Sequence, residues 1–192
     1  MKDSIARIIK ESARACSSLL TESNLHLIEE ATKEIVASLK NDGKVIVFGN
    51  GGSASDSQHM VAELVGRFKN ERRALAAIAL TVNTSILTAL SNDYDYSIVF
   101  KRQLEALARP DDVVIGISTS GKAENVIAGL KTAKEMGLRT IALTGKDGGS
   151  IKDIAGVTII VKADDTPRIQ EAHILLIHIL CEMVEDRIQE NQ

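Results

Sequence analysis

Residues 44–55 read KVIVFGNGGSAS, a short apolar run that ends in glycines. The run is rich in β-branched residues, which favour strands, and it lacks the polar alternation of a sheet face exposed to water. A helical pattern follows the glycines and continues to Phe68. A buried strand, a glycine turn and a helix in this order indicate a parallel α/β sheet.

Four further apolar runs repeat the theme, at residues 74–81, 112–118, 139–145 and 157–163. A helix-length segment is expected after each of the first three. Continuous apolar strands that alternate with helices predict a parallel sheet covered on both faces. The expected fold is α/β, a doubly wound five-stranded parallel sheet of the Rossmann or flavodoxin type.

Helical patterns flank the predicted sheet. Residues 2–20 and 24–41 form an N-terminal extension, with Asn24 as the expected N-cap and Gly43 as the expected stop. One long helix is expected at 168–189.

Pro167 suits the first turn of that last helix, where its missing N–H costs nothing. The length of 192 residues suits one domain with a full core. We therefore expect a single domain over 1–192, with helices over 1–41 and the α/β core and C-terminal helix over 44–192.

The composition narrows the function. The net charge is -3 and aromatic residues make up only 3% of the chain, so neither a basic face nor stacking aromatics favour nucleic acid binding. The N-terminus mixes charges into its apolar positions, unlike a signal peptide, and no run approaches the roughly 20 apolar residues that span a membrane. Cys16 and Cys181 lie far apart without metal spacing, which is typical of reduced thiols in a cytoplasmic protein.

Ligands of open α/β sheets bind at the carboxyl ends of strands, so the first strand-to-helix turn is a candidate site. Gly49, Gly51 and Ala54 fit a dinucleotide fingerprint. That fingerprint also needs an acid after the second strand, where residues 81–83 read TVN, so no nucleotide cofactor is expected. A plain tight turn remains one interpretation, and a turn that holds Ser53 against a small polar ligand is favoured.

The segment STSGKAEN, residues 118–125, opens another helix with three hydroxyls and a glycine. Helix N-termini bind anions, and the lack of a Walker lysine points to a single phosphate monoester, although such turns also serve as helix caps. The glycine-rich segment 144–150 can be a simple connection. Asn92 and Asp93, in SNDYDY, fit a cap better than a ligand contact.

His59 and Glu63 are four residues apart, which places both on one face of a helix. The pair is either a surface contact or half of a metal or proton-transfer site, and the local sequence leaves both open. In the C-terminal helix, Gln170 and His178 are about two turns apart. Periodicity does not choose between His173 and His178.

Together, GNGGSASDSQHMVAEL, SND, GISTSG, TGKDGG and RIQEAHILLIH resemble the sedoheptulose-7-phosphate isomerases, or phosphoheptose isomerases, of the sugar isomerase (SIS) superfamily. The match runs in order along nearly the whole chain. One departure is Ala123, where many relatives carry a serine, so one phosphate contact is missing or is met by backbone.

The resemblance implies a cytoplasmic homotetramer with active sites at subunit interfaces, a phosphosugar substrate, one zinc ion per subunit, and a product that supplies lipopolysaccharide or another surface polysaccharide. The implied zinc ligands are His59, Glu63, Gln170 and His178. With Ser53 of the first turn, the expected substrate contacts are Asn50, Gly51, Gly52, Ser53, Glu63, Asn92, Asp93, Ser118, Thr119, Ser120 and Gln170.

Moving a carbonyl between C2 and C1 requires removal of a proton from carbon and stabilisation of an enediolate. A carboxylate suits the first task and an imidazole can exchange a proton with oxygen, so Glu63 is assigned as general base and His178 as general acid. Zinc would act as a Lewis acid on the carbonyl oxygen. The alternative function is a non-catalytic tetrameric scaffold that resembles the protein associating with the replication initiator DnaA, and that relative lacks the full acid/base pair.

Overall fold

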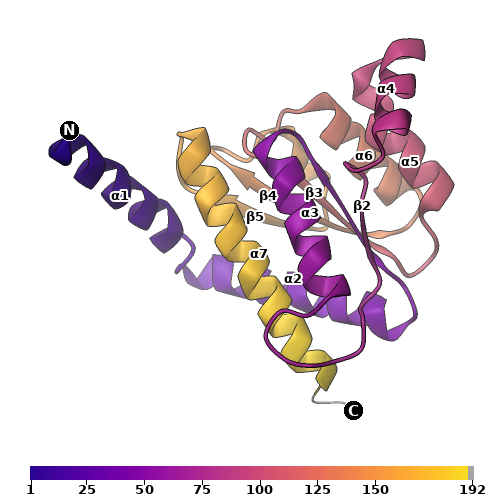
Figure 1. Ribbon diagram of the computed structural model, residues 1–192, viewed down its shortest axis with the longest axis horizontal. Coiled ribbons are helices and arrows are strands. Elements are labelled where there is room, and N and C mark those ends of the chain that lie inside the picture. Colours follow the sequence, from indigo (N-terminus) through magenta and orange to yellow (C-terminus); the bar gives the residue numbers. More distant parts are fainter. Residues whose placement is uncertain (190–192) are drawn as a thin grey trace.

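One parallel sheet of five strands forms the centre of the protein, seen in a computed structural model that describes residues 1–189 (Figure 1). The strands lie in the order β2-β1-β3-β4-β5. Their bounds are Val45–Gly49 for β1, Ala77–Ala79 for β2, Val113–Ser118 for β3, Arg139–Gly145 for β4 and Val157–Val161 for β5. The predicted doubly wound parallel sheet is confirmed.

Helices cover both faces of the sheet. Their bounds are Lys2–Ser17 for α1, Glu22–Lys40 for α2, Gly52–Val65 for α3, Thr84–Asp93 for α4, Val99–Leu107 for α5, Glu124–Glu135 for α6 and Thr166–Gln189 for α7. Helices α2, α3 and α7 pack on one face, with the end of α1 against α7, and α5 and α6 pack on the other, with α4 beside α5. In Figure 1, α3 and α7 run side by side while α1 extends away from the sheet.

The continuous apolar pattern of β1 arises because both of its faces are buried. Val45 and Val47 belong to the core beneath α2, α3 and α7, whereas Ile46 and Phe48 belong to the core beneath α5 and α6. None of these four side chains is accessible to solvent. A strand with water on one face would alternate, so two-sided burial explains why the run is apolar throughout.

Three expected elements differ in the structure. The strand expected at 74–81 is only Ala77–Ala79, because it is an edge strand that pairs with β1 alone. The last strand ends at Val161 and not at residue 163. The helix expected after β4 is wrong: a five-residue 3-10 helix, Gly149–Asp153, stands there, since Gly148 and Gly149 both adopt positive φ angles. Positive φ interrupts a right-handed helix.

The caps of α2 also differ from expectation. Thr21, and not Asn24, is the N-cap: its hydroxyl accepts the Asn24 N–H at 3.2 Å. The Asn24 amide donates instead to the Ser18 carbonyl and ties α2 to α1. At the other end the helix stops at Lys40, and Asp42, with φ of 58°, makes the turn expected of Gly43.

The remaining helix ends shift by a few residues. The first helix ends at Ser17, α3 ends at Val65 before Gly66, and α7 begins at Thr166 with Pro167 in its first turn as expected.

Both cysteines are unpaired and Cys181 is buried. Across residues 1–189, no helix combines the length and apolar character that crossing a bilayer requires.

Candidate active site

A cavity of about 280 Å³ lies at the carboxyl ends of β1 and β3. These neighbouring strands are the point where the strand order reverses, which is where open α/β sheets bind ligands. The lining residues come from the β1–α3 turn, the β3–α6 turn and the start of α7: Asn50, Gly51, Gly52, Ser53, Ile117, Ser118, Thr119, Ser120, Ala123, Thr166 and Gln170. Eight of the expected substrate contacts are thus brought together.

The N-termini of two helices meet this cavity. Gly52 begins α3 and Ala123 is the N-cap of α6, and neither helix start has a side-chain cap hydrogen bond. Uncapped helix starts present N–H groups and the positive end of the helix dipole. Hydroxyl groups of Ser118 and Ser120 line the same space. This arrangement can bind a phosphate group.

The neighbouring glycine-rich turn supports the phosphate turn from behind. Gly121 has φ of 64°, and a Cβ there would lie 2.0 Å from the Gly148 carbonyl oxygen. The Ser150 N–H donates to the Gly121 carbonyl at 2.9 Å. The segment 144–150 is therefore a structural connection that holds the β3–α6 turn in place.

The Asn50 amide is held by two residues that the sequence analysis did not assign. Asn50 and Asn125 exchange a pair of hydrogen bonds, each 2.8 Å long. The Tyr96 hydroxyl donates to Asn50 Oδ1 at 3.1 Å. Asn125 closes the segment STSGKAEN and Tyr96 closes the segment SNDYDY, so the place of each in a motif was the available signal.

His59, Glu63 and His178 lie next to one another, although they come from two helices more than a hundred residues apart in sequence. The Nε2 atoms of His59 and His178 are 3.0 Å apart, so one ring donates and the other accepts. Glu63 Oε1 lies 3.2 Å from His59 Nε2. The i,i+4 pair of α3 therefore has a third partner in α7, which a simple surface contact would lack.

Gln170 lies toward the cavity end of α7. Its amide stands against Gly52, where a Cβ would come within 2.4 Å of Nε2. About 12 Å of helix separates its Cα from that of His178. Gln170 therefore lines the cavity, whereas His178 lies about two turns closer to the C-terminus of α7.

Within residues 1–189, no three His, Cys, Asp or Glu side chains already converge as a metal centre. His59 stands between the other two in an open chain of contacts. The donors suit zinc, and their separations of 3.0 and 3.2 Å approach the roughly 3.3 Å between neighbouring ligands of a tetrahedral zinc ion.

The structure distinguishes the two histidines of α7. His173 is fully buried, and its Nε2–H donates to the Thr144 carbonyl at 3.2 Å. Burial lowers the pKa of His173 to about 4, against the opposing effect of that hydrogen bond. His173 is therefore a neutral structural histidine, and His178 is the one that faces His59.

The buried His173 predicts a loss of stability in mild acid. Its pKa falls from 6.5 to about 4 on folding, so the unfolded chain binds the proton more readily. The contribution of neutral His173 to the free energy of unfolding is fully present above pH 6.5 and declines as the pH falls toward 4. At pH 5.5 the loss is roughly 1 kcal/mol. Urea unfolding at pH 8 and pH 5.5 measures this, and His173→Gln, which keeps a donor for Thr144, should remove this part of the pH dependence. An unchanged difference in His173→Gln would contradict the assignment.

Asn92 and Asp93 do not cap a helix start, contrary to the favoured interpretation. They are the last two residues of α4, both exposed, with the Asn92 amide donating to Asp93 Oδ1. Asp95 provides the cap, for the 3-10 helix Tyr96–Ile98. A ligand contact by Asn92 and Asp93 stays a prediction.

Asp56, one turn before His59 on α3, is a polar group that sequence reasoning missed. Burial raises its pKa to about 6, opposed by the nearby His59, and its Oδ2 atom is buried without a hydrogen-bond partner. A lone aspartate in a helix gives no signal in sequence, because its burial depends on the packing around it.

A larger hollow of about 520 Å³ lies at the opposite edge of the sheet, near the amino ends of β4 and β5. Much of its charged lining is paired, as in the 2.9 Å contact between Arg139 and Glu34. We place the site at the carboxyl edge, because the ligand-binding turns lie there.

Comparisons with known proteins consistently identify similarity to one family. The sequence model of the SIS domain family matches residues 9–145. A phosphoheptose isomerase from Aquifex aeolicus is 53% identical over 190 residues, which cover 99% of each chain, and one from Geotalea daltonii is 60% identical over 159 residues, 82% of this chain and 83% of that one.

Solved structures agree with the sequence relatives. The phosphoheptose isomerase GmhA from Neisseria gonorrhoeae has a TM-score of 0.88 at 43% identity and covers 96% of this chain and 98% of its own. A phosphoheptose isomerase from Francisella tularensis has a TM-score of 0.90 at 34% identity and covers 96% and 97%.

Proposed function

The chain belongs to the phosphoheptose isomerases of the SIS domain family, and from this premise we propose how its own residues perform the reaction. The activity is an aldose–ketose isomerisation that converts D-sedoheptulose 7-phosphate to D-glycero-D-manno-heptose 7-phosphate. The observation that carries our assignment of roles is the meeting of Glu63, His59 and His178 on α3 and α7, the two helices whose first residues line a cavity suited to phosphate.

The phosphate end of the sugar binds first in this scheme. The starts of α3 and α6 and the hydroxyls of Ser118, Thr119 and Ser120 hold the phosphate, and Gln170 lies over the same cavity. Ser53 and the backbone of Asn50, Gly51 and Gly52 line the other wall. Fixing the charged end of an extended sugar orients its C1–C2 bond relative to the enzyme.

Proton transfer then takes place between the two helices. Glu63 removes a proton from C1, the electron pair forms the C1=C2 double bond, and His178 donates a proton to the C2 oxygen. Return of the proton to C2 and loss of the proton on the C1 oxygen leave the aldehyde at C1. His59 lies within hydrogen-bond distance of both groups and keeps them in register.

We propose a zinc ion held by His59, Glu63, Gln170 and His178. For His59, Glu63 and His178 the support is the donor set and the two separations, which are close to those of a tetrahedral shell. Gln170 enters the set through the family resemblance alone. When bound, zinc would supply Lewis-acid stabilisation of the charge on the substrate oxygen. A carboxylate that also binds a metal would be a weaker base, so the two roles proposed for Glu63 would oppose one another.

A homotetramer with active sites at subunit interfaces is part of the proposal. Its support is the exposed apolar surface of α1, where Ile5, Ile8 and Ile9 are all solvent-accessible on a helix that extends from the sheet (Figure 1). Light scattering tests this assembly, and a monomer at concentrations where the enzyme is active would contradict it.

The location and the use of the product are also part of the proposal. Two unpaired cysteines are compatible with a cytoplasmic location. The heptose product is suited to the synthesis of surface polysaccharides.

The direct test of the activity is incubation of purified protein with sedoheptulose 7-phosphate in the presence of zinc, followed by NMR. New resonances of the aldose anomeric carbon are expected. In D₂O, deuterium should enter the carbon-bound positions at C1 and C2. No conversion with metal supplied would favour the scaffold function instead.

The phosphate assignment predicts changes in KM. Ser118→Ala and Ser120→Ala should each raise KM by about 10- to 100-fold with little change in kcat, because a hydrogen bond to a charged phosphate holds ground state and transition state alike. Steady-state kinetics measures both constants. Ala123→Ser, which adds a hydroxyl to the same cavity, should leave KM equal or lower. Two serine deletions with unchanged KM would place the phosphate elsewhere.

A further inference from the structure

A buried ion pair joins α7 to the segment that follows α3, near the histidine pair. The side chains of Arg72 and Glu185 are each 1% exposed, and Arg72 Nε lies 3.0 Å from Glu185 Oε1. The Nε atom makes no aligned hydrogen bond, so this contact is mainly electrostatic. Buried charges are costly unless their remaining polar atoms are satisfied. The other hydrogen bonds of Glu185 and Arg72 therefore show which parts of the backbone the ion pair stabilises.

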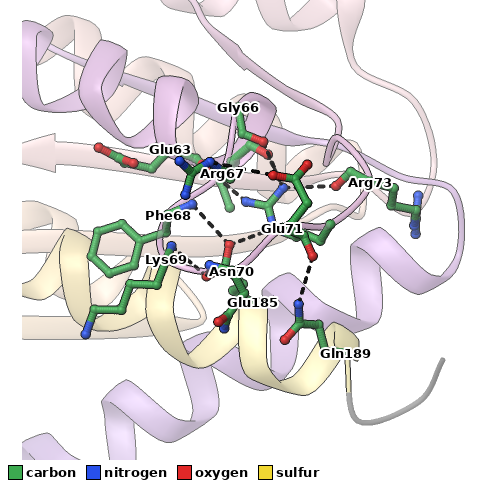
Figure 2. Close-up of polar contacts among 12 residues, drawn as sticks. Glu63, Gly66, Arg67, Phe68, Lys69, Asn70, Glu71, Arg73, Glu185 and Gln189 are labelled. Atoms are coloured by element: carbon green, nitrogen blue, oxygen red, sulfur yellow. Dashed lines mark hydrogen bonds and ion pairs between the residues drawn. The ribbon is translucent and has the colours of Figure 1, made fainter.

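The carboxylate of Glu185 holds the segment that follows α3. The backbone N–H groups of Phe68, Lys69 and Asn70 donate to it at 3.0, 2.8 and 2.8 Å, and Figure 2 shows these residues grouped around Glu185. Burial tends to raise the pKa of Glu185, but the three N–H groups and Arg72 outweigh it and lower the pKa overall. Glu185 is thus ionised at neutral pH and fastens this segment to α7.

The guanidinium of Arg72 holds the end of α3. It donates to the carbonyl oxygens of Glu63 at 2.8 Å and Leu64 at 3.0 Å. Carbonyls in the last turn of a helix have no partners within the helix, and a cation there also favours the negative end of the helix dipole. Arg72 therefore fixes the backbone of Glu63 itself.

The same segment touches the other proposed catalytic side chain. The ring of Phe68 lies against the imidazole of His178, with centroids 5.5 Å apart and planes at 37°. The Phe68 backbone is one of the three N–H groups that Glu185 binds. Glu185 thus reaches His178 through Phe68, while Arg72 reaches Glu63 directly.

We propose that Arg72 and Glu185 are positioning residues for the isomerase, which set the placement of Glu63 on α3 relative to His178 on α7. Neither lines the cavity, so their effect on catalysis acts through the helices. The inference rests on the proposed roles of Glu63 and His178. A pair that served stability alone would alter unfolding and leave the geometry of the folded site unchanged.

The test compares two variants with a matched control. Glu185→Gln keeps the size of the side chain and removes its charge. The control is Glu182→Gln, which removes the exposed Lys69–Glu182 ion pair, a 2.7 Å contact that joins the same two segments. In folded protein, Glu185→Gln should lower kcat at least about 10-fold with KM within about twofold, because the phosphate cavity is untouched. Glu182→Gln should leave both constants unchanged.

A second variant keeps the test decisive if Glu185→Gln does not fold. Phe68→Leu retains every backbone hydrogen bond to Glu185 and removes only the ring that packs on His178. It should lower kcat several-fold with KM unchanged.

NMR provides a readout that does not depend on turnover. The chain has four histidines, so the imidazole resonances can be assigned. The His178 signal should move in Glu185→Gln, which leaves the Phe68 ring present, and stay in Glu182→Gln. Folded Glu185→Gln and Phe68→Leu proteins with wild-type kcat, and an unmoved His178 signal in Glu185→Gln, would overturn the proposal, even with a lowered Tm. Wild-type protein that fails to convert the sugar would instead refute the proposed function, and a moved His178 signal would still support the positioning of α3 against α7.

Discussion

Glu63→Gln is expected to lower kcat by about 10²–10⁴-fold, because it removes the general base that takes the proton from C1. A loss of this size corresponds to about 3–5 kcal/mol of barrier. The amide keeps the shape of the side chain and an oxygen that can face His59, so the phosphosugar should still bind. Steady-state kinetics measures the loss, and substrate binding by calorimetry checks that the site persists.

A matched control for this substitution exists on α2. His26 and Glu30 form another i,i+4 pair, 3.4 Å apart and exposed, with no role in the site. Glu30→Gln should leave kcat unchanged, as expected for a surface pair worth tenths of a kcal/mol. If Glu63→Gln behaves in the same way, the pair on α3 is also only a surface contact and the mechanism is wrong.

Hydrogen exchange separates the role of Glu63 as a base from any role as a ligand. Wild-type enzyme in D₂O should introduce deuterium at carbon, and Glu63→Gln should not. If the variant also loses its metal, the loss of kcat would show only that Glu63 is a ligand. Retained metal with lost exchange would identify Glu63 as the base.

Removal of the metal is expected to abolish activity almost completely. Purified protein should contain about one first-row divalent ion per chain, with nitrogen and oxygen ligands. Elemental analysis measures this content, and a chelator followed by re-addition of zinc tests reversibility. A fully active preparation without metal would rule out the zinc assignment.

Variants of the ligands locate the ion. His59→Gln and His178→Gln should each lose metal, because their Nε2 atoms face one another across 3.0 Å. Exposed His26 on α2 provides the control, and His26→Gln should retain the full content. Gln170→Ala should weaken binding less than either histidine variant, since its amide now lies against Gly52. Retained metal in both site histidine variants would place the ion elsewhere.

The sequence by itself determined the fold class and the strand-to-helix turns. Runs such as residues 45–48 and 113–117 carry no polar side chain because both faces of the sheet are covered, and the glycines after them mark turns that only a small residue can make. These signals are local, since each depends on a few neighbouring residues. The motifs also indicated a phosphate-binding cavity, and the structure gathers most of those residues around one.

The elements that the sequence predicted poorly are those whose limits depend on distant neighbours. Strand β2 is short because it lies at the edge of the sheet, and Asn24 bonds to Ser18 and leaves the cap to Thr21. The segment after β4 is a 3-10 helix because two glycines adopt positive φ angles. The secondary-structure propensity of single residues does not predict these limits.

The resemblance selected His178 over His173, and only the tertiary structure showed the physical reason and what holds His178 in place. His173 and His178 are equivalent by periodicity, yet packing buries the first against Thr144 and brings the second to 3.0 Å from His59. Arg72 and Glu185 are ordinary charged residues in sequence, and their burial as a pair arises from the packing of α7 against the segment after α3. A pattern of residues along one chain records which face is apolar. The distance between two helices is set by all the side chains packed between them, and no single stretch of sequence encodes it.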